Sequence, residues 1–319
     1  MRAARDCSFM WAITGEMKMR SILMSIALGL TAGAVGMPPA LAQQDFSKVE
    51  IKTIKLSDTL YMLMGEGGNI GVSAGADGVY LVDDQYAPLS EKIMAAVKAI
   101  SDKPVKYVIN THWHGDHTGG NENFGKAGAT IIAHEAVRAR MEKGGELAAF
   151  KMVVPPAAAG ALPVITFSDK AALHLNGQTA SIMHMQPGHT DGDAIIYWPA
   201  ANVIHTGDTF VNGLFPFTDT GSGGKLDGII KSADTVLVLA LADDETKIIP
   251  GHGPLATRAD LARFRAMLAT VRERVLAAKA AGKTAEEWAA SKPLADLDAD
   301  WGKGFLTVDK FTQIIFGAI

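Results

Sequence analysis

The sequence predicts an α+β fold in which two β-sheets pack against each other and helices cover their outer faces. Short runs of mostly apolar residues, such as residues 79–82 and 247–249, are typical of strands, whereas residues 88–100 have the apolar spacing of an amphipathic helix. Both kinds of element alternate along both halves of the chain, which favours layered packing. Because 48% of the 319 residues are apolar, the chain can bury a sizeable core, and we expect one domain over residues 43–319.

The individual elements are predicted from apolar periodicity and from the turn residues between the runs. Strands are expected at residues 49–55, 60–64, 70–73, 79–82, 105–110, 130–133, 164–167, 172–175, 180–185, 194–198, 202–205 and 247–249. Helices are expected at residues 88–100, 135–143, 226–240 and 255–281. The Pro- and Ala-rich segment 145–161 fits neither period, and we expect it to be a loop that covers another part of the molecule.

The first 42 residues have the features of a signal peptide. Lys18 and Arg20 form a basic region, residues 21–37 are apolar, and the small residues at 40 and 42 match a cleavage site that leaves Gln43 as the mature start. The alternative is a membrane anchor, but the apolar run is short for a span and ends in two prolines. We therefore expect a periplasmic or secreted protein with no stable membrane anchor after cleavage.

Charge and cysteine content restrict the partners and the site chemistry. The sequence pI is about 6.1 and the formal net charge is -4, which disfavours nucleic acid as a partner and favours a small-molecule substrate. Cys7, the only cysteine, precedes the expected cleavage site. A metal site in the mature chain must therefore use His, Asp and Glu. Nothing in the sequence indicates an oligomeric state.

The most informative motif is a group of four candidate metal ligands within six residues. His112, His114, Asp116 and His117 follow the apolar run 105–110, at the end of a predicted strand. Only nine histidines occur in the whole chain, so a chance cluster is a poor explanation. Imidazole and carboxylate groups are typical zinc ligands, with iron or manganese as alternatives.

Three further candidates follow strands in the second half of the chain. They are His189, Asp208 and His252, and each has a glycine beside it. With the four residues of the motif they make seven candidates. Two zinc ions with three or four protein ligands each would use about this number.

This set of residues resembles the metallo-β-lactamase superfamily, whose signature is H-x-H-x-D-H followed by a later His, Asp and His. The resemblance covers residues 105–254 and implies a four-layer αβ/βα sandwich with the metals at one edge of the sheets. It implies that His112, His114 and His189 hold one metal, that Asp116, His117 and His252 hold the other, and that Asp208 bridges the two together with a hydroxide. It also implies that Asp83 supports the site from outside the ligand set.

The same resemblance implies a hydrolase that uses a metal-bridging hydroxide, with Asp116 as the catalytic residue that orients it or carries its proton. The residues around His189, the hairpin after it and the expected export are similar to true β-lactamases, and β-lactam ring opening is our leading hypothesis. However, Asp208 stands where many β-lactamases have a cysteine, and Val211 stands in place of a substrate-binding lysine. Asp208 is typical of lactonases, glyoxalase II-like thioesterases and phosphodiesterases, which are the alternatives.

Two other classes of function are disfavoured. Redox flavodiiron proteins have Glu at the position of His114, and a non-catalytic metal-binding protein would not need the complete ligand set. Among the remaining histidines, we expect His134 to have a structural or capping role. His174, His184 and His205 are expected to be core residues. Residues 221–225 could hold an anion or form a flexible loop at the mouth of the site, and residues 214–217 could form a substrate wall or pack in the core.

Overall fold

The computed structural model describes residues 45–240 and 245–319, and these residues belong to one compact unit. The predicted signal peptide, residues 1–42, lies outside the described residues, and so does Cys7. Within the described part of the chain, every helix is too short or too polar to cross a bilayer.

The first sheet has seven strands in the order β1-β2-β3-β4-β5-β6-β9. They are β1 (Lys52–Lys55), β2 (Leu60–Met64), β3 (Ile70–Gly75), β4 (Gly78–Val82), β5 (Val105–Ile109), β6 (Thr130–His134) and β9 (Ile165–Phe167). The strands from β1 to β4 are antiparallel, and those from β4 to β9 are parallel. The carboxyl ends of β4, β5 and β6 therefore share one edge of the sheet.

The second sheet has five strands in the order β10-β11-β12-β13-β14. They are β10 (Lys170–Leu175), β11 (Gln178–His184), β12 (Ala194–Trp198), β13 (Val203–His205) and β14 (Lys247–Ile249). Strands β13 and β14 are parallel, while β11, β12 and β13 are antiparallel. The loop from β11 to β12 consequently lies at the same edge as the carboxyl ends of β13 and β14.

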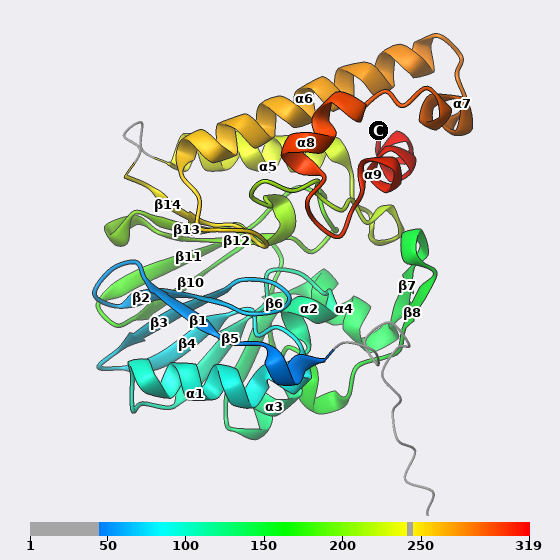
Figure 1. Ribbon diagram of the computed structural model, residues 1–319. Coiled ribbons are helices and arrows are strands. Elements are labelled where there is room, and N and C mark those ends of the chain that lie inside the picture. The colour runs from blue at the N-terminus through cyan, green and yellow to red at the C-terminus, as the bar shows by residue number, and fades with distance from the viewer. Residues whose placement is uncertain (1–44, 241–244) are drawn as a thin grey trace, which may run out of the picture. The chain divides into compact units, whose positions relative to one another are not determined.

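Helices cover the outer face of each sheet, which gives the four layers shown in Figure 1. On the first sheet lie α1 (Ser90–Ile100), α2 (Gly115–Thr118), α3 (Asn121–Lys126) and α4 (Glu135–Lys143). On the second sheet lie α5 (Leu226–Leu239) and α6 (Arg258–Ala280), followed by α7 (Ala285–Ala290), α8 (Asp298–Trp301) and α9 (Val308–Ile315). The predicted α+β sandwich is confirmed.

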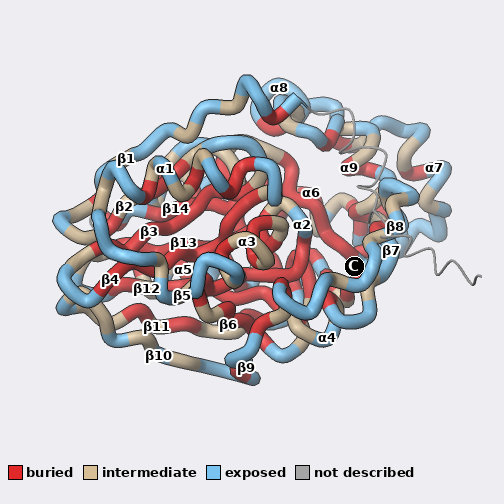
Figure 2. Tube along the Cα trace, turned by 90° about the horizontal axis from the view of Figure 1, so that it is seen from below, coloured by how far each residue is buried: buried red, intermediate tan, exposed pale blue. Residues whose placement is uncertain are grey.

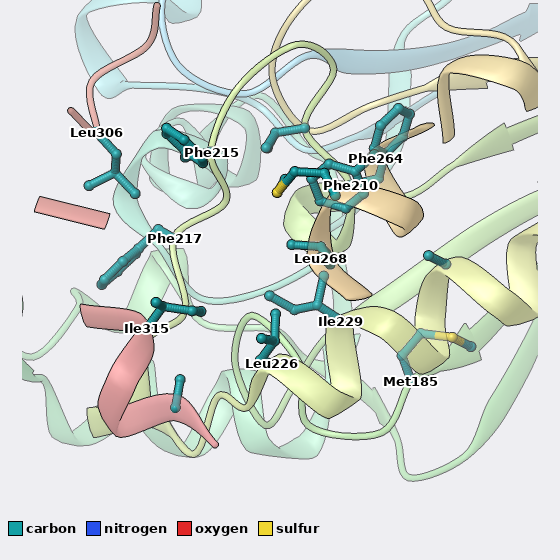
Figure 3. Packing of buried hydrophobic residues seen from close by; sticks show 14 of the residues in the cluster. Met185, Phe210, Phe215, Phe217, Leu226, Ile229, Phe264, Leu268, Leu306 and Ile315 are labelled. Atoms are coloured by element: carbon teal, nitrogen blue, oxygen red, sulfur yellow. The ribbon is translucent and has the colours of Figure 1, made fainter. Parts of the chain in front are cut away.

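Three apolar layers hold the sandwich together. Between the sheets, Met62 and Ile109 pack in one cluster with Ile196 and Trp198, and the Trp198 Nε1–H donates to the Tyr80 hydroxyl at 2.7 Å. The other two clusters join each sheet to its helices. Figure 2 shows the buried strands enclosed by exposed loops, and Figure 3 shows part of the cluster to which α5 and α6 contribute Leu226, Ile229, Phe264 and Leu268. Burial of such side chains contributes about 1.5–3 kcal/mol each.

The structure differs from the sequence prediction in the segment 145–161, in the helices α2, α3, α7, α8 and α9, which the sequence did not predict, and at several element ends. Part of the predicted loop 145–161 is a hairpin of β7 (Gly145–Leu147) and β8 (Met152–Val154), which turns through Lys151 at a φ of 52°. Helix α6 begins at Arg258 because Thr257 caps it in a reciprocal capping box with Asp260.

Candidate metal centre

The seven candidate ligands lie at the shared edge of the two sheets because each one follows a strand end there. His112 and His114 are on the loop after β5, and Asp116 and His117 are in the first turn of α2. The remaining three come from the second sheet: His189 from the β11–β12 loop, Asp208 from the 3-10 turn Gly207–Thr209 after β13, and His252 from the loop after β14.

One group of three histidines converges on a single point. One ring nitrogen from each of His112, His114 and His189 lies within 4.8 Å of the corresponding atoms of the other two. His114 Nδ1 is 2.8 Å from His189 Nε2. All three residues are buried, so water has little access to these nitrogens.

A second group contains Asp116, His117 and His252, again with donor atoms within 4.8 Å of one another. The Nε2 atoms of His117 and His252 are 3.3 Å apart. Asp116 Oδ2 lies 3.2 Å from His252 Nε2 and 3.7 Å from His117 Nε2. The Asp116 side chain is 23% exposed, so this group opens toward solvent.

Asp208 lies between the two groups. Its Oδ1 is 3.2 Å from His117 Nε2, and its Oδ2 is 3.4 Å from His252 Nε2 and 3.6 Å from His189 Nε2. One carboxylate therefore reaches histidines of both groups, which is the geometry that a bridging ligand requires. The structure thus brings all seven predicted residues together.

Groups outside the cluster fix four of the histidine rings, so that one nitrogen of each ring points inward. These contacts join His112 Nδ1 to Thr111 Oγ1 at 3.0 Å, His114 Nε2 to Asp219 Oδ2 at 3.1 Å, His117 Nδ1 to Asp83 Oδ2 at 2.8 Å, and His189 Nδ1 to the Phe217 carbonyl at 2.7 Å. Such outer partners set the tautomer and orientation of metal-binding imidazoles.

Asp83 lies where the sequence placed it, and its role is wider than expected. Besides its contact with His117, it accepts hydrogen bonds at 2.7 Å from both the backbone N–H and the hydroxyl of Thr111. Asp83 is fully buried and adopts a φ of 63°. This conformation is uncommon for a residue other than glycine, and the surrounding hydrogen bonds hold it.

Asp219 is a site residue that the sequence analysis missed. It follows the apolar segment 214–217 in an irregular stretch, and its backbone N–H donates to the His189 carbonyl at 3.0 Å. The Ser222 backbone N–H donates to Asp219 Oδ1 at 3.3 Å, and the Trp113 Nε1–H donates to Ser222 Oγ at 3.0 Å. The segment thus ties together residues next to both His114 and His189.

The remaining sequence hypotheses have mixed outcomes. The backbone N–H groups of residues 222–225 donate to backbone carbonyls, so these four groups are not available to hold an anion. Phe215 packs in the core, stacked on Phe311 at 4.4 Å.

His134 caps α4, as expected, and His205 is buried. The prediction of a core position for His174 is wrong, because it lies on an exposed face of β10.

Two glycines leave room for the ligands. A Cβ on Gly68 would lie 2.1 Å from the His117 ring, and a Cβ on Gly251 would lie 1.9 Å from Asp208 Oδ1. Real side chains do not approach this closely, so larger residues at these positions would displace the ligands. Gly251, which stands beside the candidate ligand His252, therefore has a steric role, and so has Gly68, which was not singled out in the sequence.

The charges of the cluster depend on mutual contacts. Burial lowers the pKa of His112, and the neighbouring His117 lowers it further, so this imidazole is neutral. Burial alone would lower the pKa of His252, but Asp208 and Asp116 outweigh burial and raise it to about 10. Burial alone would raise the pKa of Asp208, but His252 and His117 hold it well below its usual range. The carboxylates therefore remain anionic and attract cations.

These donors fit a pair of divalent first-row metal ions. His112 Nε2 is buried and has no hydrogen-bond partner among the described residues, an arrangement that costs about 1–3 kcal/mol unless a ligand occupies the position. The 3.3 Å between His117 Nε2 and His252 Nε2 equals the separation of about 3.3 Å expected for two nitrogens on one tetrahedral zinc ion. The three histidines of the first group and the mixed group around Asp116 would each hold one ion.

Comparison with known proteins identifies the family. A family model described as the metallo-beta-lactamase superfamily matches residues 65–252, which is more than half of the chain and includes all seven candidate ligands. The chain belongs to the metallo-beta-lactamase superfamily. This agrees with the resemblance seen in the motif and with the four-layer fold.

The relatives that the chain resembles include proteins named hydroxyacylglutathione hydrolase. A hydroxyacylglutathione hydrolase of Anaeromyxobacter dehalogenans is 29% identical over 222 residues, which cover 66% of this chain and 72% of the relative. One from Pelagibacter ubique is 27% identical over 160 residues, covering 49% of this chain and 56% of the relative. The match thus spans little more than half the length of the Pelagibacter protein.

Among solved structures, a metallo-beta-lactamase from Pontibacter korlensis superimposes with a TM-score of 0.56 at 19% identity. The superposition covers 69% of this chain and 99% of the Pontibacter chain. At this level of identity the likeness shows the fold.

Proposed function

We propose that this protein is an exported, dinuclear metal-dependent hydrolase of acyl compounds, with thioesters and lactones as the preferred substrate class. The observation that carries the proposal is the position of the Asp208 carboxylate, within 3.2–3.6 Å of histidines from both groups. Membership of the superfamily and the hydroxyacylglutathione hydrolase relatives support hydrolysis. We propose zinc as the metal, since histidine and carboxylate donors suit it.

We assign the seven residues to the two ions as ligands. His112, His114 and His189 would hold one ion, and Asp116, His117 and His252 the other, with Asp208 shared between them. When bound, the ions would supply a hydroxide near neutral pH and polarise the substrate carbonyl.

Asp116 is the proposed catalytic residue. Its side chain is the most exposed of the carboxylates in the cluster, and it lies 3.2 Å from His252. Burial would raise the pKa of Asp116, but His117 and His252 outweigh burial and lower it. An anionic carboxylate at the open side of the site can orient the attacking water and accept its proton.

Opening of β-lactams is the second candidate function. The solved metallo-beta-lactamase shares the fold, and the β-lactam amide is an acyl bond that the same chemistry can cleave. Val211, however, is buried and apolar, so it cannot bind the substrate carboxylate as a lysine would. We therefore rank β-lactams below thioesters and lactones.

Export is a further part of the proposal and rests on the sequence of residues 1–42. Cell fractionation of the expressed full chain, with amino-terminal sequencing of the product, tests it. A mature protein that begins near Gln43 outside the cytoplasm supports export, and an uncleaved cytoplasmic protein contradicts it.

The activity is tested with the zinc-loaded chain from Gln43 onward. S-lactoylglutathione, a simple lactone, a chromogenic cephalosporin and a phosphodiester are compared, each with and without chelator. We expect chelator-sensitive hydrolysis with the highest kcat/KM on the thioester or lactone. Hydrolysis that survives removal of the metals would refute the proposal, and a preference for the cephalosporin would reverse the ranking.

A further inference from the structure

A row of three phenylalanines leads from the proposed metal ligands to solvent. The ring centroid of Phe217 lies 5.9 Å from that of His114 and 5.8 Å from that of His189. Phe150 packs against Phe217 at 4.9 Å, and Phe305 lies 6.0 Å from Phe150. We call Phe217, Phe150 and Phe305 the aromatic row. Its inner end touches the site, and its outer end reaches the surface.

The outer two rings of the aromatic row are exposed although they are large and apolar. Phe150 is 37% exposed and Phe305 is 60% exposed. Single exposed apolar side chains are ordinary, but these two come from distant parts of the sequence and meet beside the site. Figures 1 and 2 both place the β7–β8 hairpin, whose turn carries Phe150, next to the C-terminal α9 segment. The exposed rings therefore form an apolar surface that a ligand can cover.

The hairpin lies close to Trp113, which stands between the candidate ligands His112 and His114 in sequence. A Cβ on Gly145, at the start of β7, would lie 3.4 Å from the Trp113 ring. The Trp113 Nε1–H is fixed by Ser222. The inner ring of the aromatic row also has a set position, because the Phe217 carbonyl lies 2.7 Å from His189 Nδ1, and a substrate would meet this ring preformed.

A positive charge stands at the outer part of the aromatic row. Lys310 Nζ in α9 lies 5.7 Å from the centroid of the Phe150 ring. Among the residues that the structure describes, no carboxylate pairs with Lys310 within ion-pair distance. The ammonium group is therefore available to attract an anion bound against the rings.

We propose that the aromatic row and Lys310 form the subsite that selects the substrate, and that it accepts a flat apolar group, preferably an aryl ring carrying a negative charge. The scissile acyl bond of such a substrate would lie at the metal centre, while the ring lies against Phe150 and Phe305. This inference rests on the proposed acyl-hydrolase function and names its substrate class.

The first test compares phenylacetyl and acetyl thioesters of the same thiol. We expect wild-type kcat/KM to favour the phenylacetyl thioester by about tenfold, the ratio that roughly 1.4 kcal/mol of ring contact gives. The Phe150→Ala, Phe305→Ala double variant should lose most of this preference. The matched control is Val238→Ala with Leu276→Ala, which removes two exposed apolar side chains from α5 and α6. This control should keep the preference.

The second test measures binding without turnover. The metal-loaded chain is titrated calorimetrically with 2-naphthoate, its neutral analogue 2-naphthamide, and acetate. We expect 2-naphthoate to bind at least about tenfold more tightly than acetate. The double Phe variant should lose this advantage. The Lys310→Gln variant should bring the dissociation constant of 2-naphthoate closer to that of 2-naphthamide.

The two tests separate failure of the subsite from failure of the proposed function. If no acyl substrate is hydrolysed but naphthoate binding follows the variants as described, the subsite stands and the acyl-hydrolase function is wrong. If hydrolysis occurs without aryl preference and the Phe variants bind naphthoate like the wild type, the subsite is overturned. Equal loss of naphthoate binding in the α5/α6 control would also overturn it, because the effect would then be unspecific.

Discussion

Replacement of Asp219 by alanine should weaken the binding of one metal ion and leave the binding of the other unchanged. The Asp219 carboxylate is buried and contacts His114 Nε2 at 3.1 Å, on the side of the ring opposite to the cluster. It contacts no other candidate ligand through its side chain among the described residues. Without it, the His114 ring loses the partner that fixes its tautomer and direction. The ion that we propose His112, His114 and His189 to hold is therefore the one affected.

The size of the expected loss in metal affinity follows from the kind of contact that is removed. Removal of an outer partner of a metal-binding histidine typically reduces metal affinity about 10- to 100-fold, which corresponds to roughly 1.4–2.7 kcal/mol. A hydrogen bond to a charged group contributes about 1.5–3 kcal/mol, which is the same range. We expect the dissociation constant of one ion to rise by this factor and that of the other to stay within about threefold.

The assay is a zinc titration of the chelator-treated protein in metal buffers, which resolves two dissociation constants. Asp227→Ala is the matched control, since this carboxylate pairs with Arg272 on the exposed surface at 2.6 Å and should leave both constants unchanged. Circular dichroism establishes that each variant is folded. If Asp219→Ala binds both ions with wild-type affinity, the supporting role of Asp219 is refuted.

Three further predictions concern the second group and the metals. Asp116→Ala should lower kcat by about 10²–10⁴-fold while one metal remains bound, because Asp116 is the proposed proton acceptor; full activity would contradict that role. Gly68→Ala should lower both Tm and the metal content, because its Cβ would meet the His117 ring, and a variant with unchanged Tm and two metals would show that the ring can move. Zinc affinity should rise with pH up to about pH 10, by up to about tenfold per unit for each proton displaced. The reason is that, despite burial, Asp208 and Asp116 raise the pKa of His252 in the metal-free site to about 10, so zinc must displace a proton there. A pH-independent affinity would exclude this competition.

The sequence predicted much of the site because its residues follow regular strands. The apolar run before His112 and the runs before Asp208 and His252 each mark a strand whose carboxyl end reaches the shared edge. Parallel pairing of β13 with β14 places Asp208 and His252 at the same end. Once the strands are recognised, convergence of the ligands follows from topology.

The parts that the sequence did not predict lie in irregular segments. Asp219 follows a stretch with no apolar period, and its contact with His114 spans 105 positions, so no local pattern indicates it. The β7–β8 hairpin was hidden in an Ala- and Pro-rich segment whose short strands lack clear alternation. Phe150 and Phe305 meet only through the tertiary fold, and their contact had no signal in either segment.

Anomalous diffraction from crystals of the zinc-loaded protein will show whether the seven side chains hold two metal ions with Asp208 shared between them. We expect two zinc peaks about 3.5–4 Å apart, one beside His112, His114 and His189 and the other beside Asp116, His117 and His252, with the Asp208 carboxylate between them. A single peak, or two peaks with Asp208 bound to neither, would contradict this expectation.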